Sequence, residues 1–145
     1  MFKKILYPTD FSDVSKKALG YIKQLRQSGA KEVVVLHVLD LRATEALHRF
    51  MEESKIQELK ENRKNEATKQ LMDIKKDLKE ADLAVNTRLE TGIPIREILR
   101  IEKEEDISLV VIGSHGVSNL EEIFLGSVSE KVIRKCKKPV LVIKR

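Results

Sequence analysis

Residues 33–39 form a run of apolar side chains, Val-Val-Val-Leu-His-Val-Leu, that only His37 interrupts. A strand with one face in water alternates apolar and polar residues, whereas a strand covered on both faces carries a continuous apolar run. Residues 108–112 and 140–143 show the same pattern. Because such strands occur in parallel sheets with helices on both faces, the sequence predicts an α/β fold built on an open parallel sheet.

The segments between these strands carry apolar residues at spacings of three and four, which is the period of an amphipathic helix. Ser12 or Asp13 can cap the first helix, Gly29 can end it, and Pro94 suits the first turn of the third. The predicted strands are residues 2–7, 33–39, 84–89, 108–112 and 140–143. Five strands therefore alternate with four helices in a single domain, residues 1–145, joined by right-handed crossovers.

The same spacing predicts which helical side chains face the core. In the first helix these are Val14, Ala18, Tyr21, Ile22 and Leu25, and in the last helix Val128, Val132, Ile133 and Cys136. Between about Leu41 and Ala81 there is neither Gly nor Pro, and a long helix is predicted with an inward stripe at Ile56, Leu59, Arg63, Ala67, Leu71, Ile74 and Leu78. Residues 41–54 are less regular and fit either a separate short helix or a mobile excursion.

The composition limits the partners and the cellular location that we expect for this protein. The 28 Lys and Arg and 23 Asp and Glu give a net charge of +5 with both signs spread along the chain, so nucleic acid is not indicated as a partner. Cys136 is the one cysteine, which excludes an internal disulfide and fits a reducing, cytoplasmic location. No stretch approaches the roughly 20 apolar residues of a membrane-spanning helix, and the N-terminal apolar run is too short for a signal peptide.

Polar residues and glycines follow three of the predicted strands, where ligands bind in open parallel sheets. Pro8-Thr9-Asp10 follows the first strand, Val38-Leu39-Asp40 ends the second, and the fourth runs into a segment with glycines at 113, 116 and 126. Glycines let backbone amides approach a ligand, and a helix beginning at Gly126-Ser127 adds unpaired amides and a positive dipole end. With hydroxyls from Ser127 and Ser129, the segment suits phosphate oxygens. A tight turn followed by a helix cap explains the same residues equally well.

The spacing of Gly113, Gly116, Gly126 and Ser127 resembles the ATP-binding signature of the universal stress protein family. Residues 4–12, Lys-Ile-Leu-Tyr-Pro-Thr-Asp-Phe-Ser, resemble the opening of that family, residues 36–38 its second strand, and residues 125–128 and 139–143 its close. The resemblance implies a Rossmann-like sheet with strand order 3-2-1-4-5 and helices on both faces. It also implies a nucleotide bound between strands one and four.

Residue by residue, the resemblance implies a site with an adenosine end and a phosphate end. Pro8, Thr9 and Asp10 would lie by the adenosine, Val38 would meet the adenine through its backbone, and Ile112 and Gly113 would line the pocket. Gly116, Gly126, Ser127 and Val128 would surround the phosphates, and His115 lies in the same loop within reach of them. The ATP would bring Mg or Mn through its phosphates. Family members also commonly dimerise through the last strand, here Val140, Leu141, Val142 and Ile143.

This chain departs from the family at two places in the loop: Val117 follows the second glycine, where many relatives have a basic residue, and Glu121-Glu122 occupies a stretch that is often basic. The loop is therefore less cationic than usual, and we expect weaker phosphate binding for that reason.

The remaining reactive side chains have simpler structural interpretations. His37 fits a hydrogen-bonded core histidine, Cys136 fits a buried structural thiol, and Asp10, Asp13 and Asp40 fit caps and strand ends better than a direct metal site. No P-loop lysine follows Gly126.

Three functions are consistent with these features. The first is a nucleotide-dependent switch or binding module with no catalytic residues of its own. The second is a slow ATP hydrolase in which Asp10 or His115 positions water or Mg²⁺. The third is a scaffold or nucleic-acid-associated protein without nucleotide.

Overall fold

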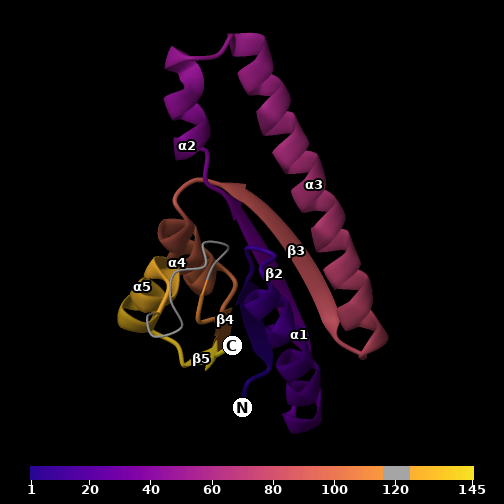
Figure 1. Cartoon of the computed structure of the whole chain (residues 1–145). Coiled ribbons are helices and arrows are strands. Elements are labelled where there is room, and N and C mark those ends of the chain that lie inside the picture. Colours follow the sequence, from indigo (N-terminus) through magenta and orange to yellow (C-terminus); the bar gives the residue numbers. More distant parts are fainter. Residues whose placement is uncertain (116–124) are drawn as a thin grey trace.

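The computed structural model describes residues 1–115 and 125–145, and its centre is a five-stranded parallel sheet (Figure 1). The strand order is β3-β2-β1-β4-β5, which confirms the predicted 3-2-1-4-5 arrangement. The strands are β1 (Lys4–Pro8), β2 (Glu32–Leu39), β3 (Ala84–Thr91), β4 (Leu109–Gly113) and β5 (Val140–Ile143). The continuous apolar runs form β2, β4 and β5; β4 is buried throughout, whereas three of the four residues of the edge strand β5 are only half-buried.

Helices cover both faces of the sheet and divide the core in two. On one face, side chains of α1 and α3 pack against Ile5, Tyr7 and Val33; on the other, α4 and α5 pack against Leu6 and Val34. The helical segments are α1 (Asp13–Leu25), η1 (Arg26–Ser28), α2 (Arg42–Glu45), η2 (Ala46–Arg49), α3 (Glu53–Glu80), α4 (Pro94–Glu104) and α5 (Ser127–Lys135).

The expected helix boundaries follow from local chemistry. Ser12 caps α1 by accepting a hydrogen bond from the Ser15 N–H, which would otherwise have no partner in the first turn. Gly29 ends the following η1 turn at φ 103°, a left-handed conformation that glycine adopts without steric cost. Pro94 occupies the first turn of α4, where its missing N–H costs nothing.

Four side chains predicted to face the core are exposed: Tyr21, Leu59, Arg63 and Ile133. Tyr21 is 43% exposed and Ile133 is 43% exposed, although Ile22 and Val132 beside them are fully buried. Successive helical residues lie about 100° apart around the axis, so a narrow line of contact with the sheet buries only one of each pair. On α3, Leu59 and Arg63 of the predicted stripe are exposed, whereas Ile56 one turn earlier is fully buried.

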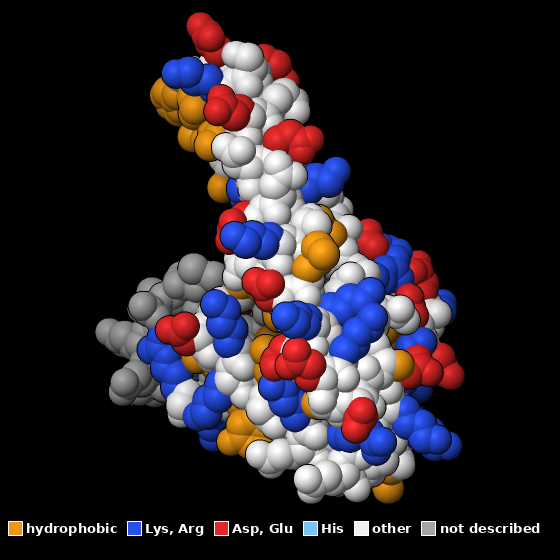
Figure 2. Space-filling model, turned by 90° about the vertical axis from the view of Figure 1, so that its right-hand side faces the viewer, with side chains coloured by type: hydrophobic (Ala, Val, Ile, Leu, Met, Phe, Trp, Pro, Cys, Tyr) orange, Lys and Arg blue, Asp and Glu red, His pale blue; other side chains and the backbone are white. Residues whose placement is uncertain are grey.

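Residues 41–54, which the sequence left open, form an arm together with the first part of α3, and this arm projects from the body (Figure 2). The separate-helix interpretation is confirmed: α2 and η2 run outward, and α3 returns from Glu53. Arg63 fixes the base of the arm by donating to the Asp40 carbonyl at 3.2 Å and the Thr44 hydroxyl at 3.1 Å. Hydrophobic atoms are exposed near the tip, where Phe50 is 82% exposed. No helix in the described ranges is both long and apolar enough to cross a membrane.

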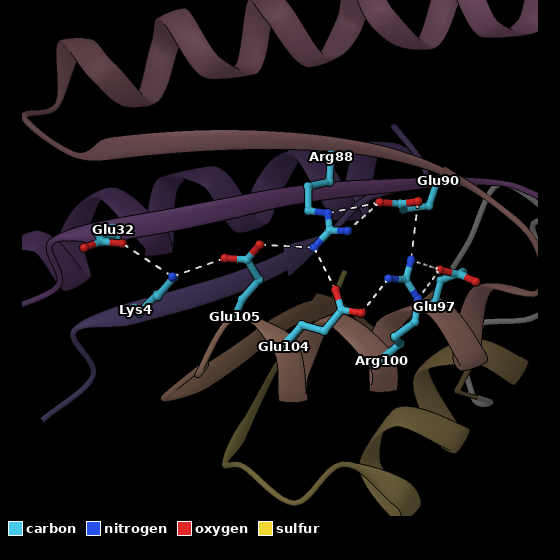
Figure 3. Close-up of polar contacts among 8 residues, drawn as sticks. All are labelled: Lys4, Glu32, Arg88, Glu90, Glu97, Arg100, Glu104 and Glu105. Atoms are coloured by element: carbon cyan, nitrogen blue, oxygen red, sulfur yellow. Dashed lines mark hydrogen bonds and ion pairs between the residues drawn. The ribbon is translucent and has the colours of Figure 1, made fainter.

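Charged side chains cover the part of the sheet that α4 leaves open beside β3 (Figure 3). We call this cluster the ionic seam. Arg88 on β3 pairs with Glu90 at 2.8 Å, with Glu105 at 3.1 Å and with Glu104 at 3.2 Å. The other members are Arg100, Glu97, Lys4 and Glu32. The seam joins the edge strand to α4 through side chains that stay partly in water.

Candidate functional site

The candidate site lies where the chain order of the sheet reverses, at the carboxyl end of β1. β1 has β2 on one side and β4 on the other. The chain leaves β1 toward α1 on one face and leaves β4 toward α5 on the opposite face. In open parallel sheets this divergence opens a crevice, and it is the general place for ligand binding.

Buried hydroxyls hold the segment after β1. The Tyr7 hydroxyl donates to the Ser15 carbonyl at 2.5 Å, and the Ser15 hydroxyl donates to the Thr9 hydroxyl at 2.7 Å. Thr9 also accepts from the Phe11 N–H at 3.0 Å. Burial raises the pKa of Tyr7, so its hydroxyl stays protonated. The Thr9 side chain thus points into this cluster, and only its backbone borders the crevice.

His37 ties the same loop to β2. Its Nδ1 lies 2.7 Å from the Thr9 carbonyl oxygen, which can only accept, so Nδ1 carries the proton. The Phe11 ring stacks on His37 with centroids 4.4 Å apart, and Phe11 reaches this position at φ 64°. Burial lowers the pKa of His37, which keeps the ring neutral at pH 7. The predicted hydrogen-bonded structural histidine is confirmed, although the ring is half-buried and not in the deep core.

Asp10 is presented by this braced loop. Its Oδ1 accepts a hydrogen bond from the Ser12 N–H at 3.0 Å, and the residue is half-buried at the crevice. Asp40, at the end of β2, is instead paired with Arg42, which holds the pKa of that carboxyl below its ordinary value. Within residues 1–115 and 125–145 no three His, Cys, Asp or Glu side chains are close enough together to hold a metal ion.

The end of β4 is joined directly to the start of α5. The Gly126 N–H donates to the Ser114 carbonyl at 2.7 Å, and the Ser129 hydroxyl donates to the Gly113 carbonyl at 2.6 Å. The Ser129 hydroxyl is buried in that contact, so it does not supply the free donor expected from the sequence. A Cβ on Gly113 would lie 3.1 Å from the Ser15 nitrogen, so glycine permits β4 to approach the first turn of α1.

Polar groups without a partner among the described residues remain at this junction. The N-cap of α5 is Gly126, in extended conformation, and no side chain caps the first turn, whereas Ser12 caps α1. His115 faces the Ser114 hydroxyl through Nδ1 at 2.7 Å, and its buried Nε2 has no hydrogen-bond partner among the described residues. Uncapped amides and a positive helix end favour an anion.

The sequence-predicted site residues divide into three groups. Asp10, His115, Gly126 and the exposed Ser127 carry groups at the crevice, together with the backbones of Pro8, Thr9 and Gly113. The side chains of Val38, Ile112 and Val128 pack into the core beside α4 and α5. Gly116 lies outside the described residues, as do Val117, Glu121 and Glu122.

Sequence reasoning missed the side chains that brace the site. Tyr7 and Phe11 lie within the opening segment that resembles the family, but the resemblance assigned them no role, and Ser15 lies outside it. Their partners are two to 26 residues away in sequence. The positive φ of Phe11 has no compositional signal, since glycine and asparagine are the residues that usually mark it.

Cys136 is half-buried beside Glu102. Burial and that carboxylate raise the pKa of the thiol to about 12, so the thiol stays protonated at neutral pH, which favours the structural interpretation although the residue is only half-buried.

Comparison with known proteins shows that nearly the whole chain matches one protein family. The model of the Universal stress protein family matches residues 1–144. Universal stress protein MJ0577 of Methanocaldococcus jannaschii is 41% identical, with 100% of this chain and 96% of the relative covered. The solved structure of MJ0577 superposes with a TM-score of 0.91 at 43% identity, covering 100% and 97% of the two chains.

Two more distant structures share the fold alone. A universal stress protein family protein from Arabidopsis thaliana, solved with AMP bound, has a TM-score of 0.71 at 18% identity and covers 99% of this chain and 92% of its own. A universal stress protein solved in complex with cAMP has a TM-score of 0.66 at 22% identity, with coverage of 99% and 97%.

Proposed function

Because the chain belongs to the universal stress protein family, we propose that it binds ATP in the crevice between β1 and β4 and acts as a nucleotide-dependent switch or binding module. The adenine-containing ligands AMP and cAMP in two proteins of the same fold support this choice of ligand class. The chemistry of the crevice supports the placement of the phosphates.

The observation that carries the proposal is a set of polar groups at the start of α5 that have no partner among the described residues. The first-turn amides have no side-chain cap, and His115 Nε2 is buried without a described partner. A buried donor or acceptor without a partner costs about 1–3 kcal/mol. A phosphate oxygen there would accept from the amides, and from His115 in the tautomer that carries its proton on Nε2. In this proposal Gly126, Ser127 and Val128 surround the phosphates through the helix end, with His115 beside them and Gly116 in the same loop.

The adenosine would lie along the ends of β1 and β2. Asp10 faces the ribose or adenine, Pro8 and Thr9 contribute backbone, and Val38 meets the adenine through its backbone. Ile112 and Gly113 form the floor. The hydroxyl cluster and the His37–Phe11 stack would keep Asp10 in place before the ligand arrives, which lowers the entropic cost of binding.

A divalent ion, Mg or Mn, would arrive with the nucleotide and offset its phosphate charge. The described carboxylates do not gather around a metal position, so we assign the ion to the phosphates. The protein itself contributes hydrogen-bond donors and the positive end of the α5 helix dipole.

The test is a calorimetric titration of nucleotide-stripped protein with ATP and Mg²⁺, repeated with AMP and with Gly126→Asp. Gly126 has φ −60° and ψ 152°, which aspartate adopts as an N-cap, so the variant can fold and its carboxylate takes the phosphate position. We expect ATP affinity to fall at least tenfold, about 1.4 kcal/mol or more.

Gly20→Asp is the matched control, because Gly20 has open space around it on α1. This variant has the same added charge and should bind ATP like the wild type. A folded wild type that does not bind ATP, or a Gly126→Asp variant that binds it equally well, would overturn the proposal.

We further propose that residues 1–145 act as one domain in the cytoplasm, and that two copies pair through β5. Val140, Leu141 and Val142 are only half-buried on the edge strand, which leaves their backbone edge open to another strand. Light scattering at working concentration tests the dimer, and a monomer mass there would contradict it.

A further inference from the structure

The net charge of the chain equals the charge of one short segment. Residues 131–138 contain five of the 28 Lys and Arg and none of the 23 Asp and Glu. The other 137 residues therefore carry 23 basic and 23 acidic side chains, which cancel. The formal charge of +5 is thus equal to the charge of this one segment. The net charge alone did not indicate nucleic acid as a partner, because it does not show that basic residues are concentrated in one segment.

These five side chains occupy the water-facing side of α5 and the turn after it, and we call them the basic surface. Ser129 and Val132 point into the protein, and Lys131, Arg134 and Lys135 are exposed on the other side of the helix. Lys137 and Lys138 are exposed in the turn. α5 lies on the outside of the molecule (Figure 1), so no described element covers this face.

The cations of the basic surface are almost free of ion pairs. Among the described residues only Arg134 has a carboxylate within reach, Glu130 at 3.5 Å, and both are largely exposed. In the ionic seam, by contrast, Arg88 and Arg100 each contact three glutamates (Figure 3). A cation already paired has little to gain from a phosphate, whereas an unpaired one can exchange its counterions for it.

The turn that carries two of these lysines is held rigidly. The buried carboxylate of Glu102 accepts hydrogen bonds from the Lys137 N–H at 2.9 Å and the Lys138 N–H at 2.8 Å. Glu102 is only 5% exposed, so its carboxylate is hydrogen-bonded inside the protein and does not lie on the basic surface. The backbone position of Lys137 and Lys138 is therefore fixed before any partner arrives, although their side chains stay in water.

We propose that the basic surface binds the phosphate backbone of double-stranded nucleic acid without reading its sequence. Residues 125–145 contain no aromatic side chain on which unpaired bases could stack, which disfavours single strands. Ile133 is the one apolar side chain exposed on α5, too little for a helix that inserts into a membrane surface. A protein interface would need an apolar centre that this face lacks. Phosphates on a regular duplex need only cations, which this face supplies.

The test is fluorescence anisotropy of a labelled duplex of about 20 base pairs with the full-length protein at several salt concentrations. Four to five phosphate contacts predict a slope of log affinity against log salt of about −4. Affinity should then fall about 250-fold between about 50 and about 200 mM salt. In Lys131→Glu/Lys135→Glu the slope should become shallower by about 2.

Lys69→Glu/Lys76→Glu on α3 is the control, since both lysines are exposed and the charge change is the same. It should keep most of the wild-type affinity and slope; circular dichroism should find both variants folded. Equal losses in the two variants would overturn the proposal by showing a general charge effect. So would the absence of duplex binding at low salt, or binding only to anionic phosphatidylserine vesicles. The nucleotide titration is independent of these outcomes.

Discussion

Two polar clusters of this protein differ in charge and in burial. Under the Asp10 loop, Tyr7, Thr9 and Ser15 form a buried cluster of neutral hydrogen bonds. The ionic seam between β3 and α4 uses full charges, but its side chains stay partly in water. A neutral hydrogen bond gains little on its own, yet leaving one buried partner unsatisfied is costly. Exposed ion pairs gain little and lose little, because water replaces either partner. Burial, more than charge, should therefore decide which cluster the fold depends on.

The largest expected effect is from Tyr7→Phe. This change leaves the buried Ser15 carbonyl and the Thr9–Ser15 hydroxyls without the phenol, and it should lower the free energy of unfolding by about 2 kcal/mol. Chemical denaturation measures the change. Tyr21→Phe is the matched control, since Tyr21 is 43% exposed, and it should be nearly neutral. Equal effects at the two tyrosines would remove the special role of the buried cluster.

A smaller effect is expected when Arg88→Met removes the centre of the ionic seam. Although Arg88 contacts three glutamates, its side chain is 25% exposed, and we expect a loss of at most about 1 kcal/mol. High salt should reduce that loss further. Arg96→Met is the control, because Arg96 on α4 is exposed and has no ion pair in the described ranges. A loss larger than that of Tyr7→Phe would reverse the comparison.

The smallest effect is the pH dependence of the seam. Hydrogen bonding from Arg100, and then from Arg88, lowers the pKa of Glu104 from its ordinary value of 4.5. A lowered folded-state pKa stabilises the protein fully above 4.5, and this stabilisation is lost as pH falls through the lower value. The stability difference between wild type and Arg100→Met should therefore shrink between pH 7 and pH 3. The Tyr7→Phe difference should not change there, and thermal unfolding across that range would detect either deviation.

The sequence predicted the strands best where the apolar run is continuous. β2, β4 and β5 are continuous apolar runs, and their positions differ from the prediction by one residue at most. Partial burial is harder to predict, as Tyr21 and Ile133 show, because a 3.6-residue period indicates a direction and not the width of the contact. At the site, glycines and strand ends were visible in the sequence. The ionic seam and the His37–Phe11 stack were not, because their partners meet only after the sheet has formed.

The arm would convert a small rotation at the sheet into a larger displacement at its tip. α3 has 28 residues, and the buried residues Leu71, Ile74 and Leu78 that hold it to the sheet lie near its far end. At about 1.5 Å per residue, the helix extends about 27 Å from Leu71 to Glu53, so a rotation of about 5° at the sheet displaces the tip by about 2 Å. Arg63 joins this lever to the end of β2, beside the crevice. A small adjustment at the strand ends would thus become a larger displacement at the tip of the arm, where Phe50 is exposed.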